Sequence, residues 1–196
     1  MRYRVSRKNS LNEKLWPDPA FKTRAVLLSD DDVHYHPEDL DWVFRTWREQ
    51  GRDRLSGAFA RCVVRKADGS WAYSFCRDGE DSYALVLTGL AMVDISYLEY
   101  YSSDHPVMEQ VRALVDARFN CEDIALNFVV SSLTCNGPLQ LRGAQKAVNT
   151  MPPAGISTKK GHLEARHKCM NDFVDMFGYM PLRNSTDYLA KGFVNG

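Results

Sequence analysis

The sequence predicts an α/β fold, and two observations carry this prediction. Short apolar runs of strand length alternate along the chain with longer amphipathic runs of helical period, which is the order typical of α/β domains. The 196 residues are 44% hydrophobic and 26% charged, so we expect one domain with a substantial core. No internal repeat or low-complexity tract breaks this pattern.

The first expected strand and helix frame a run of acidic residues. Ala25–Leu28 is wholly apolar and predicts a buried strand of the kind found in parallel sheets. Three aspartates at positions 30–32 follow, after which Pro37 can occupy the first turn of a helix. Apolar side chains then recur at helical spacing until Gly51 ends the helix; they are Leu40, Val43, Phe44 and Trp47.

A hairpin is expected next, because Arg61–Arg65 and Trp71–Phe75 flank the sequence Asp68-Gly69. If these two residues form the loop, Cys62 faces Phe75 across the strand pair. Cys76 then points to the opposite face of the sheet, because side chains alternate along a strand. We therefore expect no disulfide between Cys62 and Cys76.

The second half of the chain continues the alternation. Strands are expected at 85–87 and 91–93 around Gly89, followed by a helix that Pro106 opens and a helix that Asn120 caps. A strand plus a long loop is expected over 139–158, and a last helix from about Gly161 to Phe177. The apolar residues of the first two helices are Val107, Val111, Leu114 and Val115, and then Ile124, Leu126, Phe128 and Val129. Trp42, Phe44 and Trp47 are expected in the core. Tyr97, Tyr100 and Tyr101 are expected to pack, although tyrosines can also stack on a sugar.

Charge and composition exclude some classes of function. Lys plus Arg and Asp plus Glu both number 25, so the formal net charge is 0 and no nucleic-acid partner is expected. Any anion that the protein binds must be held by a local group such as a metal ion, a single Arg or a helix N-terminus. No apolar stretch approaches the roughly 18 residues of a membrane span, and no secretory signal is expected. The five cysteines form no C-x-x-C pair, which argues against zinc; their odd number leaves at least one free thiol.

The aspartates at 30–32 are the first candidate site. They follow an apolar strand, and open α/β sheets place their ligands at the carboxyl ends of strands. Oxygen ligands on a short turn suit Mn²⁺ or Mg²⁺, which can bridge a diphosphate. A solvated turn with a helix cap is the alternative.

Two further segments carry candidate chemistry. Glu122 and Asp123 stand at an expected helix start, where they either complement the helix dipole or serve a reacting centre. The basic run from Lys159 to Cys169 is either a solvated helix face or a mobile lid whose Arg166 meets a phosphate. By their spacing alone, His162 and His167 are expected on the surface rather than at a metal.

Six blocks in this order resemble the exostosin-type C-terminal glycosyltransferase domain, glycosyltransferase family 64. The blocks are Asn9 with Leu11–Leu15, Ala25–Asp32, Tyr83–Gly89, Asn120–Phe128, Arg166–Cys169 and Met180–Ser185. Gly155–Ser157 and Gly161-His162 look closest to the plant and fungal branch. The resemblance implies a GT-A-like, Rossmann-type fold with a central mixed sheet flanked by helices. It also implies metal-dependent, retaining transfer of a hexose or HexNAc from a nucleotide-sugar to a glycan or glycolipid acceptor. The expected donor is a UDP-sugar, and the expected cofactor is Mn²⁺.

The same resemblance assigns roles to individual residues. It implies Asp32 as the metal ligand and Asp123 and Arg166 as the catalytic pair. The implied substrate-binding residues are Asn9, Lys14, Asp30, Asp31, Glu122 and His162. Cys121 and Cys169 fall on the family's disulfide. Lys14 stands where some members carry Arg, which keeps the charge but loses the fork geometry.

The family domain begins with further nucleotide-binding βα units before the position of Asn9. Residues 1–196 are therefore expected to form a single partial domain, without those N-terminal units. A competing hypothesis is a non-catalytic remnant that acts as an interaction module, with a homodimer as one possibility. An Asp-centred phosphatase is a third hypothesis, for which the sequence offers less support. By resemblance the chain is expected in the lumen of the secretory pathway, Golgi or ER, which permits disulfides.

Overall fold

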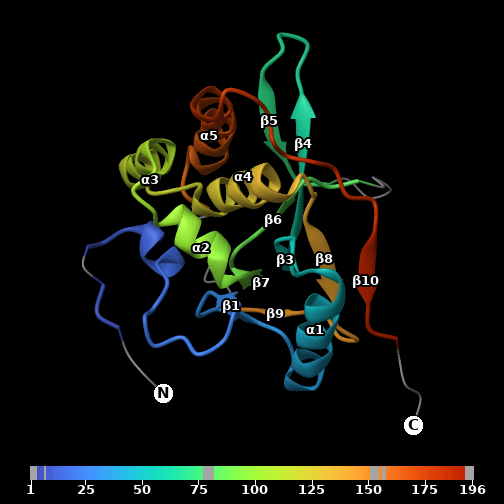
Figure 1. Ribbon diagram of the computed structural model, residues 1–196. Helices are drawn as coiled ribbons and strands as arrows, with labels where there is room; N and C mark the ends of the chain where they lie inside the picture. The colour runs from blue at the N-terminus through green and yellow to red at the C-terminus, as the bar shows by residue number, and fades with distance from the viewer. Residues whose placement is uncertain (1–3, 7, 77–81, 151–154, 156–157, 193–196) are drawn as a thin grey trace.

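A computed structural model describes residues 4–6, 8–76, 82–150, 155 and 158–192, which form a mixed α/β structure (Figure 1). The described helices are a 3-10 helix η1 (Leu11–Leu15), α1 (Pro37–Gln50), α2 (Ile95–Tyr101), α3 (Pro106–Arg118), α4 (Glu122–Thr134) and α5 (His162–Phe177). The described strands are β1 (Ala25–Ser29), β2 (Val33–His34), β3 (Ser56–Gly57), β4 (Ala60–Arg65), β5 (Trp71–Ser74), β6 (Leu85–Val86), β7 (Leu90–Asp94), β8 (Leu139–Arg142), β9 (Val148–Asn149) and β10 (Tyr188–Ala190).

The largest sheet in the described part of the chain is mixed, as the resemblance implied, and has the strand order β1-β7-β3-β8-β10. Strands β1 and β3 both run antiparallel to β7, whereas β3, β8 and β10 run parallel to one another. The prediction for Ala25–Leu28 is therefore wrong in detail, because β1 is an antiparallel edge strand with Leu28 buried and Leu27 40% exposed. A short apolar run does not reveal how many neighbours the strand has.

The sheet separates two apolar clusters, and β7 contributes to both. Leu90 and Met92 pack with Val43 and Trp47 of α1 on one face. Ala91 and Val93 belong to the larger cluster with α2, α3, α4 and α5 on the other face. This division follows from the alternation of side chains along a strand.

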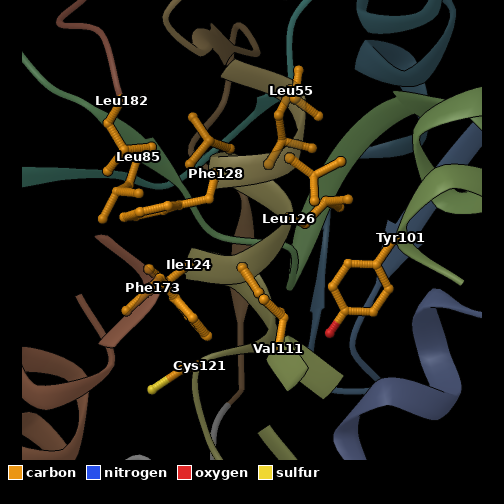
Figure 2. Close-up of a cluster of buried hydrophobic side chains, with 14 of the residues drawn as sticks. Leu55, Leu85, Tyr101, Val111, Cys121, Ile124, Leu126, Phe128, Phe173 and Leu182 are labelled. Atoms are coloured by element: carbon orange, nitrogen blue, oxygen red, sulfur yellow. The ribbon is translucent and has the colours of Figure 1, made fainter. Parts of the chain in front are cut away.

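Helix α4 lies at the centre of the larger cluster (Figure 2). Every residue from Asp123 to Ser131 is buried, which is typical of a helix that is apolar on nearly all sides. The ring of Phe128 meets Phe173 of α5 edge-on, with 5.6 Å between the ring centroids. The first turn of α4 is therefore held at a fixed place against α5 and the sheet.

The predicted hairpin is present, but its register differs by one residue from the prediction. Cys62 pairs with Ser74, and the amide of Lys66 donates to the carbonyl of Ser70, so three residues form the loop. Gly69 adopts a φ of 84°, the left-handed conformation that a three-residue loop requires. The shift places Cys62 and Cys76 on the same face, where they form a disulfide with 5.0 Å between their Cα atoms. The expectation of no Cys62–Cys76 bridge is wrong, because a one-residue slip moves a side chain to the other face.

The four long helices are confirmed near their predicted bounds, with some differences at their ends. Cys121, not Asn120, is the N-cap of α4, and it has a left-handed φ of 77°. Trp47 lies in the core as expected, whereas Phe44 is 40% exposed. Tyr101 is buried, so packing is the correct interpretation of that tyrosine. The elements η1, α2 and β10 were not predicted.

Two remaining expectations concern the loop and the membrane. Strands β8 and β9 lie in the segment 139–158 that was predicted as strand plus loop, although residues 151–154 and 156–157 of it lie outside the described residues. No helix described by the structure combines the length and apolarity that crossing a bilayer requires.

Candidate active site

A cavity of about 1280 Å³ brings together most of the predicted site residues. The segments that line it include the N-terminal region and η1, the turn after β1, the β4–β5 hairpin, the loop between β6 and β7, the first turn of α4 and the start of α5. Predicted residues on its wall are Lys14, Asp30, Asp31, Asp32, Glu122, Asp123, His162 and Arg166. Asn9 is exposed and is not among the lining residues that the structure describes, although the neighbouring Ser10 is.

The three aspartates occupy the turn between β1 and β2 at the cavity wall. The backbone amide of Asp30 donates to the carbonyl of Gly89, at 2.8 Å. A Cβ atom at position 89 would stand only 2.9 Å from Oδ2 of Asp30, so glycine permits this close approach. The amide of Thr150 fixes the other end of the turn by donating to the carbonyl of Asp32, at 2.8 Å.

Lys14 links the aspartate turn to the start of α4. Its Nζ lies 3.1 Å from Oδ1 of Asp30 and 3.0 Å from Oε1 of Glu122. Burial works to lower the pKa of Lys14, but the two carboxylates outweigh burial and raise this pKa above its usual value. Lys14 therefore carries a positive charge at the centre of an acidic wall.

A buried ion pair forms part of this wall. Arg166 of α5 donates from Nη2 to Oδ2 of Asp123 at 2.7 Å, and the two residues are only 5% and 6% exposed. Nη1 of Arg166 also donates to Oδ1 of Asn120 at 3.3 Å, and the guanidinium carbon lies 4.1 Å from the centre of the Tyr73 ring. Removing the charge of either partner would leave the other uncompensated in a region of low dielectric.

A disulfide joins the two helices that supply this pair. Cys121 and Cys169 are bonded, with 6.4 Å between their Cα atoms, as the resemblance implied. Cys121 directly precedes Glu122 and Asp123, and Cys169 lies one turn beyond Arg166. The bond therefore fixes the start of α4 next to the turn of α5 that carries the arginine.

The neighbouring carboxyl groups of Glu122 and Asp123 have opposite pKa shifts. Burial raises the pKa of Glu122 and the charge of Asp123 adds to this, although Lys14 acts in the other direction. Burial also disfavours ionisation of Asp123, but Arg166 outweighs it and holds the pKa of Asp123 below its usual value. Adjacent carboxyls whose environments separate their pKa values are a common feature of sites with acid–base or charge-stabilising chemistry.

His162 occupies the first position of α5, at the cavity wall. Its Nδ1 lies 3.2 Å from Nδ2 of Asn120, and its backbone carbonyl accepts from the same amide at 3.3 Å. Burial lowers the pKa of His162, and the positive charge of Arg166 adds to this effect. His167 lies in the next turn and accepts at Nδ1 from the backbone amide of Tyr73, at 3.1 Å.

Sequence reasoning missed several residues that shape this site. Asn127 bonds to both backbone groups of Val86, at 3.1 and 2.8 Å, and so fixes β6 to α4. An Asn inside an apolar helix needs buried partners, which was an available signal. Thr88 is completely buried at the cavity wall, and its hydroxyl has no hydrogen-bond partner among the described residues. Thr88 falls in the matched block Tyr83–Gly89 but was assigned no role, and no sequence signal pointed to Tyr73.

The carboxylates suit a cation that is shared with a ligand. No group of three or more His, Cys, Asp or Glu side chains in the described part of the chain is arranged to hold a metal ion. Mn²⁺ and Mg²⁺ are commonly bound by one or two carboxylates together with substrate phosphates. The turn at Asp30, Asp31 and Asp32 can supply such a partial set of oxygen ligands.

Comparisons with known proteins show which family this chain matches. A model described as "Glycosyl transferase family 64 domain" matches residues 1–191. Glucosamine inositolphosphorylceramide transferase 1 of Arabidopsis thaliana is 35% identical over 184 residues, which cover 91% of this chain and 23% of that protein. The Exostosin-like-3 homolog of Caenorhabditis elegans is 33% identical over 177 residues, which cover 90% of this chain and 21% of that protein.

A third relative is named for the transfer of a different sugar. Glycosylinositol phosphorylceramide mannosyl transferase 1 of Arabidopsis thaliana is 29% identical over 188 residues, which cover 93% of this chain and 54% of that protein. The chain thus spans between about a fifth and about half of the length of these curated relatives. Because the family model covers nearly the whole chain, the protein belongs to glycosyltransferase family 64, the exostosin-like family.

Proposed function

We propose that this chain transfers a hexose or HexNAc from a nucleotide-sugar, a UDP-sugar in the first instance, to a glycan or glycolipid acceptor with retention of anomeric configuration. The single observation that carries the proposal is the convergence of the aspartate turn and the Asp123–Arg166 pair on one cavity. These groups are 91 residues or more apart in the sequence (123 − 32 = 91), so local capping alone does not account for their meeting.

The cations at the cavity suit a diphosphate leaving group. Cleaving the bond between an anomeric carbon and a diphosphate accumulates negative charge on the leaving oxygens, which fixed positive groups stabilise. Lys14, Lys159 and Lys160 line the cavity and can serve this purpose. A Mn²⁺ ion held by Asp32 and the donor phosphates would act as a Lewis acid on the same oxygens.

Asp123 is suited to the sugar side of the reaction. Its lowered pKa keeps it ionised at neutral pH, and Arg166 fixes its orientation. An ionised carboxylate next to the anomeric carbon stabilises an oxocarbenium-like transition state, either as nucleophile or through its charge. Glu122 and His162 flank Asp123 on the wall and can contact hydroxyl groups of the transferred sugar.

The relatives and the disulfides support a class of acceptor and a location for the protein. Two plant relatives are named for transfer of glucosamine or mannose to inositolphosphorylceramides, and others are named exostosins. A glycolipid or glycan acceptor is therefore the first class to test here. Two disulfides fit an oxidising compartment, so we place the chain in the lumen of the secretory pathway, Golgi or ER.

A thermal-shift experiment tests the proposal without knowledge of the acceptor. A ligand that binds only the folded state raises the unfolding temperature, by an amount equivalent to about 2.7 kcal/mol at 100 times its Kd. Mn²⁺ with UDP should stabilise the wild type more than either alone. Asp32→Asn should remove this synergy, whereas Asp104→Asn, an equal charge change on an exposed residue between α2 and α3, should keep it. No response in the wild type would favour the non-catalytic interaction module.

Turnover with a panel of nucleotide-sugars and acceptors then tests catalysis. Asp123→Asn and Asp32→Asn should each lower kcat by at least about 100-fold, because each removes a charge that the transition state needs. Nuclear magnetic resonance of the first-formed product should show the anomeric configuration of the donor. Full activity in both variants, or an inverted product, would contradict the assigned roles.

A further inference from the structure

A short segment before β10 carries a motif that the proposed reaction does not use. Asn184-Ser185-Thr186 has the form Asn-x-Thr, and no other Asn in the 196-residue sequence is followed by Ser or Thr two positions later. This form is the acceptor motif for N-linked glycosylation in proteins that enter the secretory pathway. We propose that Asn184 carries an N-linked oligosaccharide in the mature protein. The inference rests on the proposed secretory location and not on the proposed catalytic roles.

The structure presents the two recognised side chains of the motif on the surface. Asn184 and Thr186 are exposed, whereas Ser185 between them is 3% exposed. The backbone of Ser185 pairs with Tyr83 through two hydrogen bonds of 2.8 and 3.0 Å. Side chains alternate along such an extended segment, so burying Ser185 directs both neighbours outward. The exposure of Asn184 is thus a consequence of how the segment is anchored.

The side chain of Ser185 makes further contacts that hold this segment in place. The hydroxyl of Ser185 donates to the carbonyl of Pro138 at 2.5 Å and accepts from Nη2 of Arg54 at 2.9 Å. Gly137 packs closely against Ser185, because a Cβ atom at position 137 would lie only 2.5 Å from the Ser185 hydroxyl. The folded chain can therefore carry a large group on Asn184 without moving this backbone.

The proposed site is separate from the candidate active site. Asn184 and Thr186 line a shallow hollow of about 490 Å³, which shares no lining residue with the large cavity. Figure 1 shows the segment crossing from the end of α5 toward β10, away from η1 and the N-terminal region that border the large cavity. Asn184 therefore does not line the cavity in which the donor and acceptor are proposed to bind.

The attachment reaction requires a co-reactant from the host cell. The amide nitrogen of Asn184 would form a bond to the anomeric carbon of a polyprenyl-diphosphate-linked oligosaccharide. The bond from that carbon to the diphosphate breaks, the diphosphate leaves with the electron pair, and the amide loses one proton. In the folded protein the backbone of Ser185 is hydrogen-bonded to Tyr83, so the transferring enzyme must act before this pairing forms.

Expression in eukaryotic cells behind a supplied secretion signal tests the proposal. The secreted wild type should migrate more slowly than the same sample treated with peptide N-glycosidase F. That treatment converts the modified Asn184 to Asp, which peptide mass spectrometry detects. Asn184→Gln and Thr186→Ala should abolish the shift, whereas Thr186→Ser should keep it, because a serine hydroxyl also satisfies the motif.

The controls separate this proposal from the others. All three exposed-residue variants should keep the unfolding temperature and the basal transfer activity of the wild type. Protein folded in bacteria and then mixed with detergent-opened microsomes should stay unmodified, because the backbone of Ser185 is already paired with Tyr83. The absence of a shift in the secreted wild type, or a shift that persists in Asn184→Gln, overturns the proposal. An unmodified protein in its own cells also overturns it and points to a wrong location, whereas a catalytically inactive but glycosylated chain contradicts only the proposed function.

Discussion

At the scale of single residues, the acidic pair at the start of α4 lies both at a helix N-terminus and at the cavity, two environments that sequence reasoning had treated as alternatives. Glu122 and Asp123 lie in the first turn of the helix, where negative charge complements the helix dipole. Both also line the cavity and meet cations from other elements, Lys14 and Arg166. Capping and a role in the site are compatible, because the N-terminus of α4 points at the cavity.

The Asp123–Arg166 pair predicts a large stability effect as well as a catalytic one. Asp123→Ala would leave the buried guanidinium of Arg166 without its carboxylate, so the free energy of unfolding should fall by about 3–5 kcal/mol. Asp31→Ala, an exposed aspartate at the same cavity, should change it by less than about 0.5 kcal/mol. Urea unfolding followed by circular dichroism measures both. Equal effects would mean that the pair is not buried as described.

Removing the hydroxyl of Thr88 should not destabilise the protein, in contrast to removing the carboxylate of Asp123. It is completely buried without a hydrogen-bond partner in the described structure, so it contributes an uncompensated desolvation cost. Thr88→Val keeps the shape, and the free energy of unfolding should stay the same or rise by about 1 kcal/mol. Ser131→Ala is the contrasting variant, because its hydroxyl donates to the carbonyl of Asn136 at 2.9 Å and its loss should destabilise. A destabilised Thr88→Val protein would indicate a hidden partner, such as an internal water.

At the scale of elements, Asp94 explains a helix that sequence reasoning missed. Helix α2 has only seven residues, four of them aromatic or β-branched, which gives it little intrinsic helix propensity. Its start is fixed by Asp94, whose side chain accepts from the amide of Ser96 at 3.0 Å and from two nitrogens of Arg24, each at 3.0 Å. An Asp at the end of an apolar strand was the available sign of an N-cap.

The cap at Asp94 predicts a pH dependence of stability. Burial alone would raise the pKa of Asp94, but the hydrogen bonds from Arg24 and Ser96 outweigh it and lower this pKa. A carboxyl with a lowered folded-state pKa contributes stability that is present above the unfolded value of about 3.9 and is lost as pH falls through the folded value. Asp94→Asn should therefore be less stable than the wild type at pH 6, and the difference should vanish in strong acid. Urea midpoints between pH 2 and 6 measure this, with Asp104→Asn as a control that should follow the wild type.

Local signals predicted the helices well and the strand pairings poorly. Pro37 and Pro106 mark the first turns of α1 and α3, and apolar spacing gave most of each helix. The hairpin was located by Asp68-Gly69, but its register depends on whether the loop has two residues or three, which the dipeptide does not decide. The two-residue strand β3 lies between β7 and β8 only because of long-range pairing, for which the sequence carries no local sign.

For the candidate site, all of the substrate, metal and catalytic residues implied by the resemblance except Asn9 line the cavity, whereas spacing alone left alternatives open. The sequence could not reveal that Lys14 connects Asp30 to Glu122, because this contact depends on how η1 packs against α3. It also could not reveal Tyr73, whose ring stacks on Arg166 from a hairpin of uncertain register. Contacts between distant elements are a property of the folded chain, and periodicity does not encode them.

At the scale of the whole molecule, the two disulfides restrain different parts of the fold. Cys62–Cys76 closes a loop with a sequence separation of 14 inside the hairpin. Cys121–Cys169 has a separation of 48 and joins α4 to α5. In the loop-entropy model the two bonds contribute about 3 and about 4 kcal/mol, so their effects on stability should be similar. Their effects on activity should differ, because only the second joins the elements that carry Asp123 and Arg166.

Paired alanine variants test this separation of stability from catalysis. Cys121→Ala with Cys169→Ala should lower kcat/KM between about tenfold and 100-fold, because a displacement of about 1 Å between catalytic groups can cost this much. Cys62→Ala with Cys76→Ala is the matched control and should lower the unfolding temperature by a comparable amount with a much smaller loss of kcat/KM. Assays are made well below both unfolding temperatures, so that only folded protein contributes. If both pairs lose activity in proportion to their stability, the bond at Cys121 acts on the fold as a whole and does not position the ion pair.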